Sequence, residues 1–162
     1  MMDVFIDTNV LYNRNEQLDK ALFVTKLKEI IEEIEANDIY TEIKLLLPRM
    51  VLNELYQQQL EMFDGLNKRL ENVSMPNLQY DRAFNYGEYL EKIFKEAIME
   101  IQKGIVEVDV VDFPNSDKLG NIISRAIKKA PPFEGKEKHS DKGFKDVLIW
   151  ESIKEYKEKH IN

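Results

Sequence analysis

Val4-Phe5-Ile6-Asp7-Thr8-Asn9 is a short apolar run of β-branched and aromatic residues that ends in an acid and two small polar residues. Such a run predicts a buried strand followed by a turn. Leu45-Leu46-Leu47 is a second buried run, which Pro48 follows, and residues 105–111 predict a third strand. Because helical patterns separate these runs, we expect parallel strands with helices on both faces of the sheet.

The helices are predicted from apolar residues that recur every three or four positions and from end signals such as Gly104. Leu66 and Leu70 are expected to face inward, and Trp150 is expected in the core. The predicted helices are residues 17–36, 49–70, 82–103, 117–129 and 144–160, with loops at 73–81 and 130–142. The fold class is therefore α/β, a helix-rich three-layer α/β/α domain over residues 1–162 with a short central parallel sheet.

Composition excludes several classes of protein. The chain has no cysteine, which rules out disulfides, thiolate metal sites and cysteine nucleophiles. No segment approaches the ~20 apolar residues that span a bilayer, and the N-terminus lacks the features of a signal peptide. We therefore expect no membrane association and a cytoplasmic location.

The charge is distributed unevenly. The net charge is −7, which disfavours general electrostatic capture of nucleic acid. Residues 125–145 nevertheless contain seven bases and three acids, a local balance of +4. A basic segment on an acidic protein suits a substrate that carries phosphate, and a solvated lysine-rich loop is the alternative.

Three carboxylates are expected at the carboxyl edge of the sheet, where ligands of open parallel sheets gather. Asp7 ends the first strand, Glu54 falls in the early turns of the next helix, and Asp146 begins the last helix. Converging carboxylates repel one another unless a cation neutralises them, and such hard oxygen ligands favour Mg²⁺ or Mn²⁺. Taken singly, each acid also suits a turn cap, a solvated helix position or a helix N-terminus.

The three segments resemble the PIN-domain superfamily of metal-dependent nucleases. Residues 4–9, 47–55 and 145–150 are similar to its first, second and third acidic motifs. The resemblance implies that Asp7, Glu54 and Asp146 are the metal ligands of an endoribonuclease that hydrolyses single-stranded RNA. It also implies that Thr8 or Asn9 orients Asp7 through a hydrogen bond.

A narrower pattern is similar to one branch of PIN-like proteins. It combines Arg125, the loop Pro131-Pro132-Phe133 and the run Lys142-Gly143-Phe144-Lys145-Asp146. By this similarity Arg125, Lys142 and Lys145 contact phosphates of the substrate. Solvation of the two lysines in a loop remains the alternative. A core position is preferred for Trp150 over a role in base stacking, because Trp150 is at helical spacing with Val147 and Ile153.

PIN domains usually continue beyond this last helix into a further strand and acidic motif, whereas the sequence ends at His160-Ile161-Asn162. The C-terminal strand is therefore expected to be missing, and Asp141 is the nearest acid that could replace the absent ligand. A catalytically incomplete module that binds RNA or protein is a second hypothesis, as is a homodimer or protein partner that completes the site. A phosphatase of the haloacid-dehalogenase type is disfavoured because Asn9 stands where those enzymes carry a second Asp.

Overall fold

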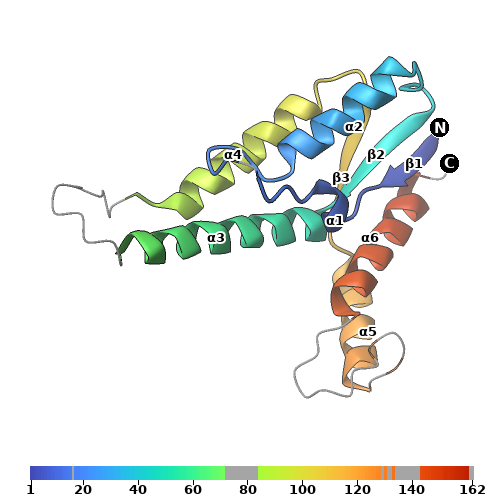
Figure 1. Ribbon diagram of the computed structural model, residues 1–162. Coiled ribbons are helices and arrows are strands. Elements are labelled where there is room, and N and C mark those ends of the chain that lie inside the picture. Colours follow the sequence, from blue (N-terminus) through green and yellow to red (C-terminus); the bar gives the residue numbers. More distant parts are fainter. Residues whose placement is uncertain (16, 72–83, 129, 131–132, 134–142, 161–162) are drawn as a thin grey trace.

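The computed structural model describes residues 1–15, 17–71, 84–128, 130, 133 and 143–160 (Figure 1). In these residues the strands are β1 (Met2–Phe5), β2 (Ile43–Pro48) and β3 (Glu107–Val111). The helices are α1 (Thr8–Leu11), α2 (Val24–Ala36), α3 (Arg49–Glu71), α4 (Tyr86–Ile101), α5 (Ser116–Ile127) and α6 (Phe144–His160).

The three strands form a parallel sheet in the order β1-β2-β3. Val4 is in register with Leu45, and Leu45 with Val108, so these side chains share one face of the sheet. That face belongs to the larger apolar core, to which α2, α3 and α4 also contribute. The predicted parallel pairing is therefore confirmed, with β2 at the centre.

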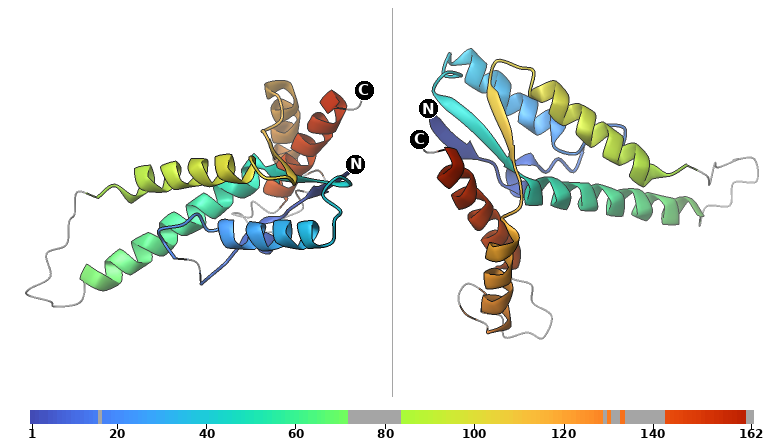
Figure 2. Two further views of the ribbon diagram at one scale, coloured as in Figure 1. Left: turned by 90° about the horizontal axis from the view of Figure 1, so that it is seen from above. Right: turned by 180° about the vertical axis from the view of Figure 1, so that it is seen from behind.

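Helix α6 covers the opposite face of the sheet, and Figure 2 shows α6 and α2 on opposite sides of the strands. Tyr156 donates a hydrogen bond to Asp109 of β3 over 2.6 Å, and Lys157 Nζ lies 4.0 Å from Asp3 Oδ2 of β1. The last turns of α6 therefore lie near the start of β1, and its first turn lies toward the carboxyl ends of the strands. This arrangement confirms the three-layer α/β fold, and no described helix is long and apolar enough to cross a membrane.

Helices α3 and α4 run side by side and extend away from the sheet as an arm (Figures 1 and 2). With 23 residues, α3 is about 34 Å long at 1.5 Å per residue. The rings of Phe63 and Tyr86 stack across the arm with centroids 3.9 Å apart. The inward orientation predicted for Leu66 and Leu70 is wrong, since they are 42% and 44% exposed on the part of α3 that projects past the sheet.

The helix predicted at residues 17–36 begins only at Val24, and residues before it form turns. Backbone groups of that segment bond to side chains of the arm instead of to a helical turn. The side-chain oxygen of Gln59 accepts a hydrogen bond of 2.9 Å from the backbone N–H of Leu22, and its amide nitrogen donates one of 2.6 Å to the carbonyl of Lys20. The sequence analysis also missed α1, a single turn that starts directly after Asp7.

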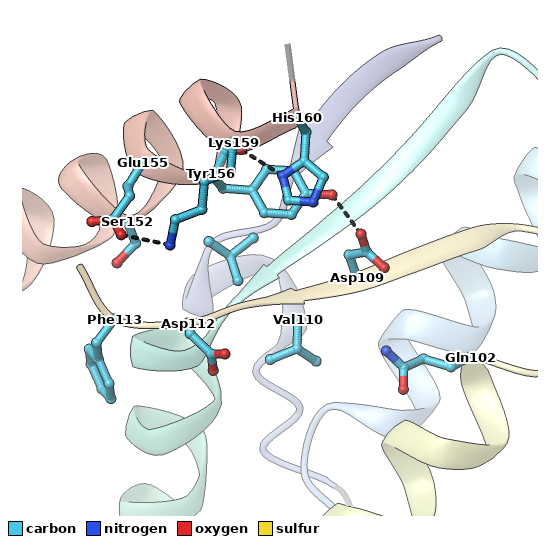
Figure 3. Close-up of a pocket in the computed structure, with 11 residues that line it drawn as sticks. Gln102, Asp109, Val110, Asp112, Phe113, Ser152, Glu155, Tyr156, Lys159 and His160 are labelled. Atoms are coloured by element: carbon cyan, nitrogen blue, oxygen red, sulfur yellow. Dashed lines mark hydrogen bonds and ion pairs between the residues drawn. The ribbon is translucent and has the colours of Figure 1, made fainter. Parts of the chain in front are cut away.

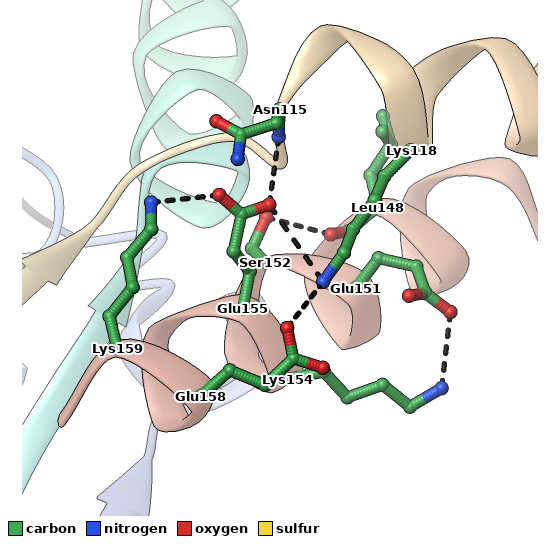
Figure 4. A network of polar contacts seen from close by, with 9 residues as sticks. All are labelled: Asn115, Lys118, Leu148, Glu151, Ser152, Lys154, Glu155, Glu158 and Lys159. Atoms are coloured by element: carbon green, nitrogen blue, oxygen red, sulfur yellow. Dashed lines mark hydrogen bonds and ion pairs between the residues drawn. The ribbon is translucent and has the colours of Figure 1, made fainter. Parts of the chain in front are cut away.

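The remaining helices match their predictions, and one buried acid joins two of them. Asn115 is the N-cap of α5, but its side chain makes no capping hydrogen bond. Its backbone N–H donates instead to Glu155 of α6 over 2.8 Å, and Lys159 neutralises the other oxygen of that carboxylate at 2.8 Å (Figure 4). Glu155 thereby fixes the position of α5 relative to α6. The loop predicted at 73–81 and most of that at 130–142 lie outside the described residues.

Candidate active site

Asp7 lies at the carboxyl end of β1, where the chain leaves the sheet. It occupies the N-cap position of α1, yet its side chain makes no capping hydrogen bond. Its Oδ2 instead accepts a hydrogen bond of 3.0 Å from Nδ2 of Asn9. The carboxylate is therefore held by a neighbouring amide and is exposed to solvent at the edge of the sheet.

Glu54 joins three separate segments of the chain at the same edge. It lies in the second turn of α3, which starts directly after β2. Its Oε2 accepts a hydrogen bond of 2.8 Å from the hydroxyl of Thr8, which is only 6% exposed. Its Oε1 lies 3.0 Å from the ammonium group of Lys145 in the first turn of α6. Glu54 is thus linked to the residue after Asp7 and to the residue before Asp146.

Asp146 meets Asp7 across a small cavity of about 180 Å³. The two carboxylates come from opposite ends of the chain, one after β1 and one in the first turn of α6. The other residues that line this cavity are apolar: Phe5, Ile6, Val51, Ile149, Trp150 and Ile153. Two acids therefore face one cavity whose remaining wall is apolar, at the edge where the sequence placed them.

Of the three cations expected to contact phosphate, two are described. Arg125 of α5 lines a second cavity, of about 470 Å³, whose wall also includes Asp146, Trp150 and Lys154. Lys145 is ion-paired with Glu54. Lys142, together with the substitute ligand Asp141, lies outside the described residues.

A comparison with known families assigns the chain. A family model described as PIN domain matches residues 4–162, which is nearly the whole sequence. The chain belongs to the PIN domain family. No curated protein and no solved structure matches it. PIN domains are nuclease-type domains that generally use divalent metal ions.

The acids of this PIN domain fit such an ion in chemistry and partly in position. Carboxylate oxygens are hard ligands of the kind that Mg²⁺ and Mn²⁺ prefer. Asp7 and Asp146 share one cavity, whereas Glu54 holds Lys145 as its counter-charge. Among the described residues, no three acids or histidines lie close enough together to hold a metal ion. The two aspartates are therefore the residues best placed to hold one.

Two larger cavities of the PIN domain lie elsewhere, and residues that hold helices and strands together line them. One, of about 340 Å³, lies between β3 and the last turns of α6 (Figure 3). Burial alone would raise the pKa of Asp109 there, but hydrogen bonds from Lys44 and Tyr156 hold it below its usual value. The other cavity, about 700 Å³, lies between α3 and α4 and includes Arg49, whose guanidinium group pairs with Asp112 at 2.8 Å. Neither contains Asp7, Glu54 or Asp146.

Trp150 lines the cavity of Asp7 and Asp146, and its position was predicted wrongly from the sequence. The expectation of a core position is contradicted by a side chain that is 55% exposed. Its neighbours at helical spacing, Val147 and Ile153, are both buried, but different parts of the protein cover them. Val147 packs in the cluster shared with Ile122 of α5, whereas Ile153 faces the cavity beside β1. Trp150 lies between these two contacts and next to the acids.

Proposed function

We propose that this PIN domain is an endoribonuclease that hydrolyses phosphodiester bonds of single-stranded RNA with the help of Mg²⁺ or Mn²⁺. The observation that carries the proposal is the common cavity of Asp7 and Asp146, beside which Glu54 is held by Thr8. Two carboxylates at one cavity repel each other and stabilise a bound cation. The sequences at residues 131–133 and 142–146 support a narrower placement in one branch of the family. The lack of cysteine fits a cytoplasmic protein.

In this proposal Asp7 and Asp146 hold the ion, and Glu54 completes the acidic edge. A bound divalent ion would lower the pKa of a water molecule and stabilise charge on the phosphoryl group. Asn9 orients the Asp7 carboxylate through its amide, and Thr8 holds Glu54 in place. Lys145 neutralises Glu54 and, with Arg125, brings positive charge to the edge that a phosphate would approach. Hydrolysis adds the water oxygen to phosphorus and releases the ribose oxygen with a proton.

The test is cleavage of end-labelled single-stranded RNA in Mn²⁺, with EDTA and Asp7→Asn alongside. We expect cleavage by the wild type and its loss in both controls and in Asp146→Asn. Asp38→Asn is the matched control, because it makes the same chemical change at a position directly after α2. Asn also tolerates the positive φ of 57° at this position. Cleavage that persists in both Asp7→Asn and Asp146→Asn would refute the assignment.

One observation favours a second candidate function, a module that binds RNA without cutting it. Glu54 is paired with Lys145 at 3.0 Å, so a lysine already supplies the counter-charge that a metal would otherwise provide. In that case RNA binding would weaken on charge reversal of Lys142 and Lys145, and no turnover would occur in Mg²⁺ or Mn²⁺. The cleavage assay separates the two functions, because only the nuclease produces labelled fragments.

A further inference from the structure

Asp146, Trp150 and Lys154 form a stripe along α6. They are spaced four residues apart, which places them on one side of a helix with 3.6 residues per turn. All three are exposed, although residues on both sides of the stripe are buried. The stripe therefore starts at a proposed metal ligand and continues through an aromatic ring to a cation.

The position of Trp150 relies on more than its exposure, since single exposed apolar residues are common on protein surfaces. Its side chain lines both the cavity of Asp7 and Asp146 and the adjoining cavity of Arg125 and Asp146. It thus stands between the cavity of the two aspartates and a second cavity whose wall carries two cations, Arg125 and Lys154, and two acids, Asp146 and Glu151. At this place the ring is 55% exposed.

Two cations lie near the ring of Trp150. Lys154 Nζ lies 5.4 Å from the centre of the indole ring and also pairs with Glu151 at 3.1 Å. Arg125 lines the same cavity as the ring and Lys154. Aromatic rings that stack with bases, combined with cations along the backbone, are the usual means of binding single-stranded nucleic acid.

We propose that Trp150 stacks on a nucleobase of single-stranded RNA, next to the phosphodiester that a divalent ion at Asp7 and Asp146 would hold. The inference rests on the proposed function and specifies how its substrate is held. The base takes the place of the Lys154 ammonium group over the ring. Arg125 and Lys154 then face the phosphates that flank the stacked nucleotide. A duplex, whose bases are already stacked, cannot use this platform without unpairing.

The chain contains a single tryptophan, so its fluorescence reports on Trp150 directly. The experiment titrates the full chain in Mg²⁺ with a short fluorescein-labelled oligouridylate, and it follows tryptophan emission and dye anisotropy together. An oligomer of the same length built of abasic ribose phosphates is the matched ligand. We expect oligouridylate to quench the emission, and the abasic oligomer to bind more weakly without quenching.

Three variants test the residue. Trp150→Ala should weaken oligouridylate binding about 5- to 150-fold, the usual range for loss of one stacked base, with a smaller effect on the abasic oligomer. Trp150→Phe keeps a ring and should lose less. Phe84→Ala is the matched control, because it removes a ring that is 52% exposed at the far end of the arm. It should leave the binding of both oligomers unchanged.

The possible results separate this inference from the proposed function. If RNA binds without a change in emission and Trp150→Ala binds as tightly as the wild type, the stacking role is overturned and the nuclease stands. If RNA binds and quenches the tryptophan emission but is not cut in Mn²⁺, the stacking role stands and the proposed nuclease activity is refuted. If no RNA binds, both are overturned. If emission changes with protein concentration in the absence of RNA, the ring is covered by a second copy and the inference is wrong.

Discussion

Thr8 ties Glu54 to the end of β1 through a single hydrogen bond, and its effect can be separated from that of its methyl group. Thr8→Val keeps the shape of a residue that is 6% exposed but leaves Glu54 Oε2 without its donor. Because the acceptor is charged and partly exposed, we expect a loss of about 1–2 kcal/mol in the free energy of unfolding. Thr8→Ser keeps the hydroxyl and should retain more of the cleavage activity than Thr8→Val. The measurements are urea unfolding and RNA cleavage, and equal loss of cleavage in both variants would show that the methyl group matters as much as the hydrogen bond.

The acids of the site could be predicted from sequence because their positions follow from where elements end. Asp7 follows a strand and Asp146 begins a helix, and parallel strands bring such ends to one edge. The ion pair of Glu54 with Lys145 could not be predicted in this way. It depends on how closely the first turn of α6 approaches α3, which is set by side-chain packing between helices that are remote in sequence.

Trp150 shows the limit of periodicity at the scale of one residue. Helical spacing identifies which side of a helix a residue shares with its neighbours, but not what covers that side. Val147 and Ile153 are buried against different elements, and the stripe between them is open. The spacing of Trp150 four residues after Asp146 was the signal that could have placed it beside the acid.

At the scale of elements, the segment before α2 is held by the arm and not by its own helical propensity. Gln59 is fully buried and bonds to backbone groups of both Lys20 and Leu22. Gln59 also donates to the Tyr86 hydroxyl over 3.0 Å, and this hydroxyl donates to the carbonyl of Leu18 over 2.8 Å. The apolar pattern of residues 17–36 could not reveal this, because the competing hydrogen bonds come from residues about forty positions or more away.

Gln59→Leu should therefore destabilise the protein more than Tyr86→Phe. The leucine leaves a buried N–H of Leu22 and a partly buried carbonyl of Lys20 without partners, and we expect a loss of about 2–4 kcal/mol. Tyr86→Phe removes only the bond to Leu18 and the acceptor for Gln59, and we expect a loss of about 1–2 kcal/mol. Urea unfolding of both variants checks the order. Similar losses would mean that residues 17–23 are held by apolar contacts.

At the scale of the whole molecule, the charged contacts between the sheet and α6 should make stability depend on pH. Lys44 of β2 lies 2.7 Å from Asp109 of β3, which also accepts the hydroxyl of Tyr156. Because the pKa of Asp109 is lowered in the folded state, its contribution is present above its usual value of 3.8 and is lost as the pH falls further. For a side chain that is 37% exposed, we expect about 1 kcal/mol or less.

Asp109→Asn isolates that contribution. The difference between wild type and variant in the midpoint of urea unfolding should be largest near pH 6 and should shrink toward pH 3, a window set by the usual pKa of an aspartate. Tyr156→Phe removes one of the three groups that lower the pKa of Asp109, the others being Lys44 and His160, and should reduce this pH dependence only in part. A difference that stays constant with pH would mean that the charge of Asp109 does not stabilise the contact between sheet and helix.

The whole molecule carries a net charge of −7, so RNA binding must rely on local positive charge and should depend on salt in a limited way. Each phosphate neutralised on a single strand contributes a slope of about −0.7 to the logarithm of affinity against the logarithm of salt concentration. Because Lys145 is already paired with Glu54, we count contacts from Arg125, Lys142 and Lys154 and expect a slope of about −2. Arg125→Ala should make it shallower by about 0.7. Lys28→Ala, which removes an exposed cation paired with Glu100 at 2.9 Å, should leave the slope unchanged. If both variants change the slope equally, RNA senses only the total charge, and the basic segment has no particular role in binding.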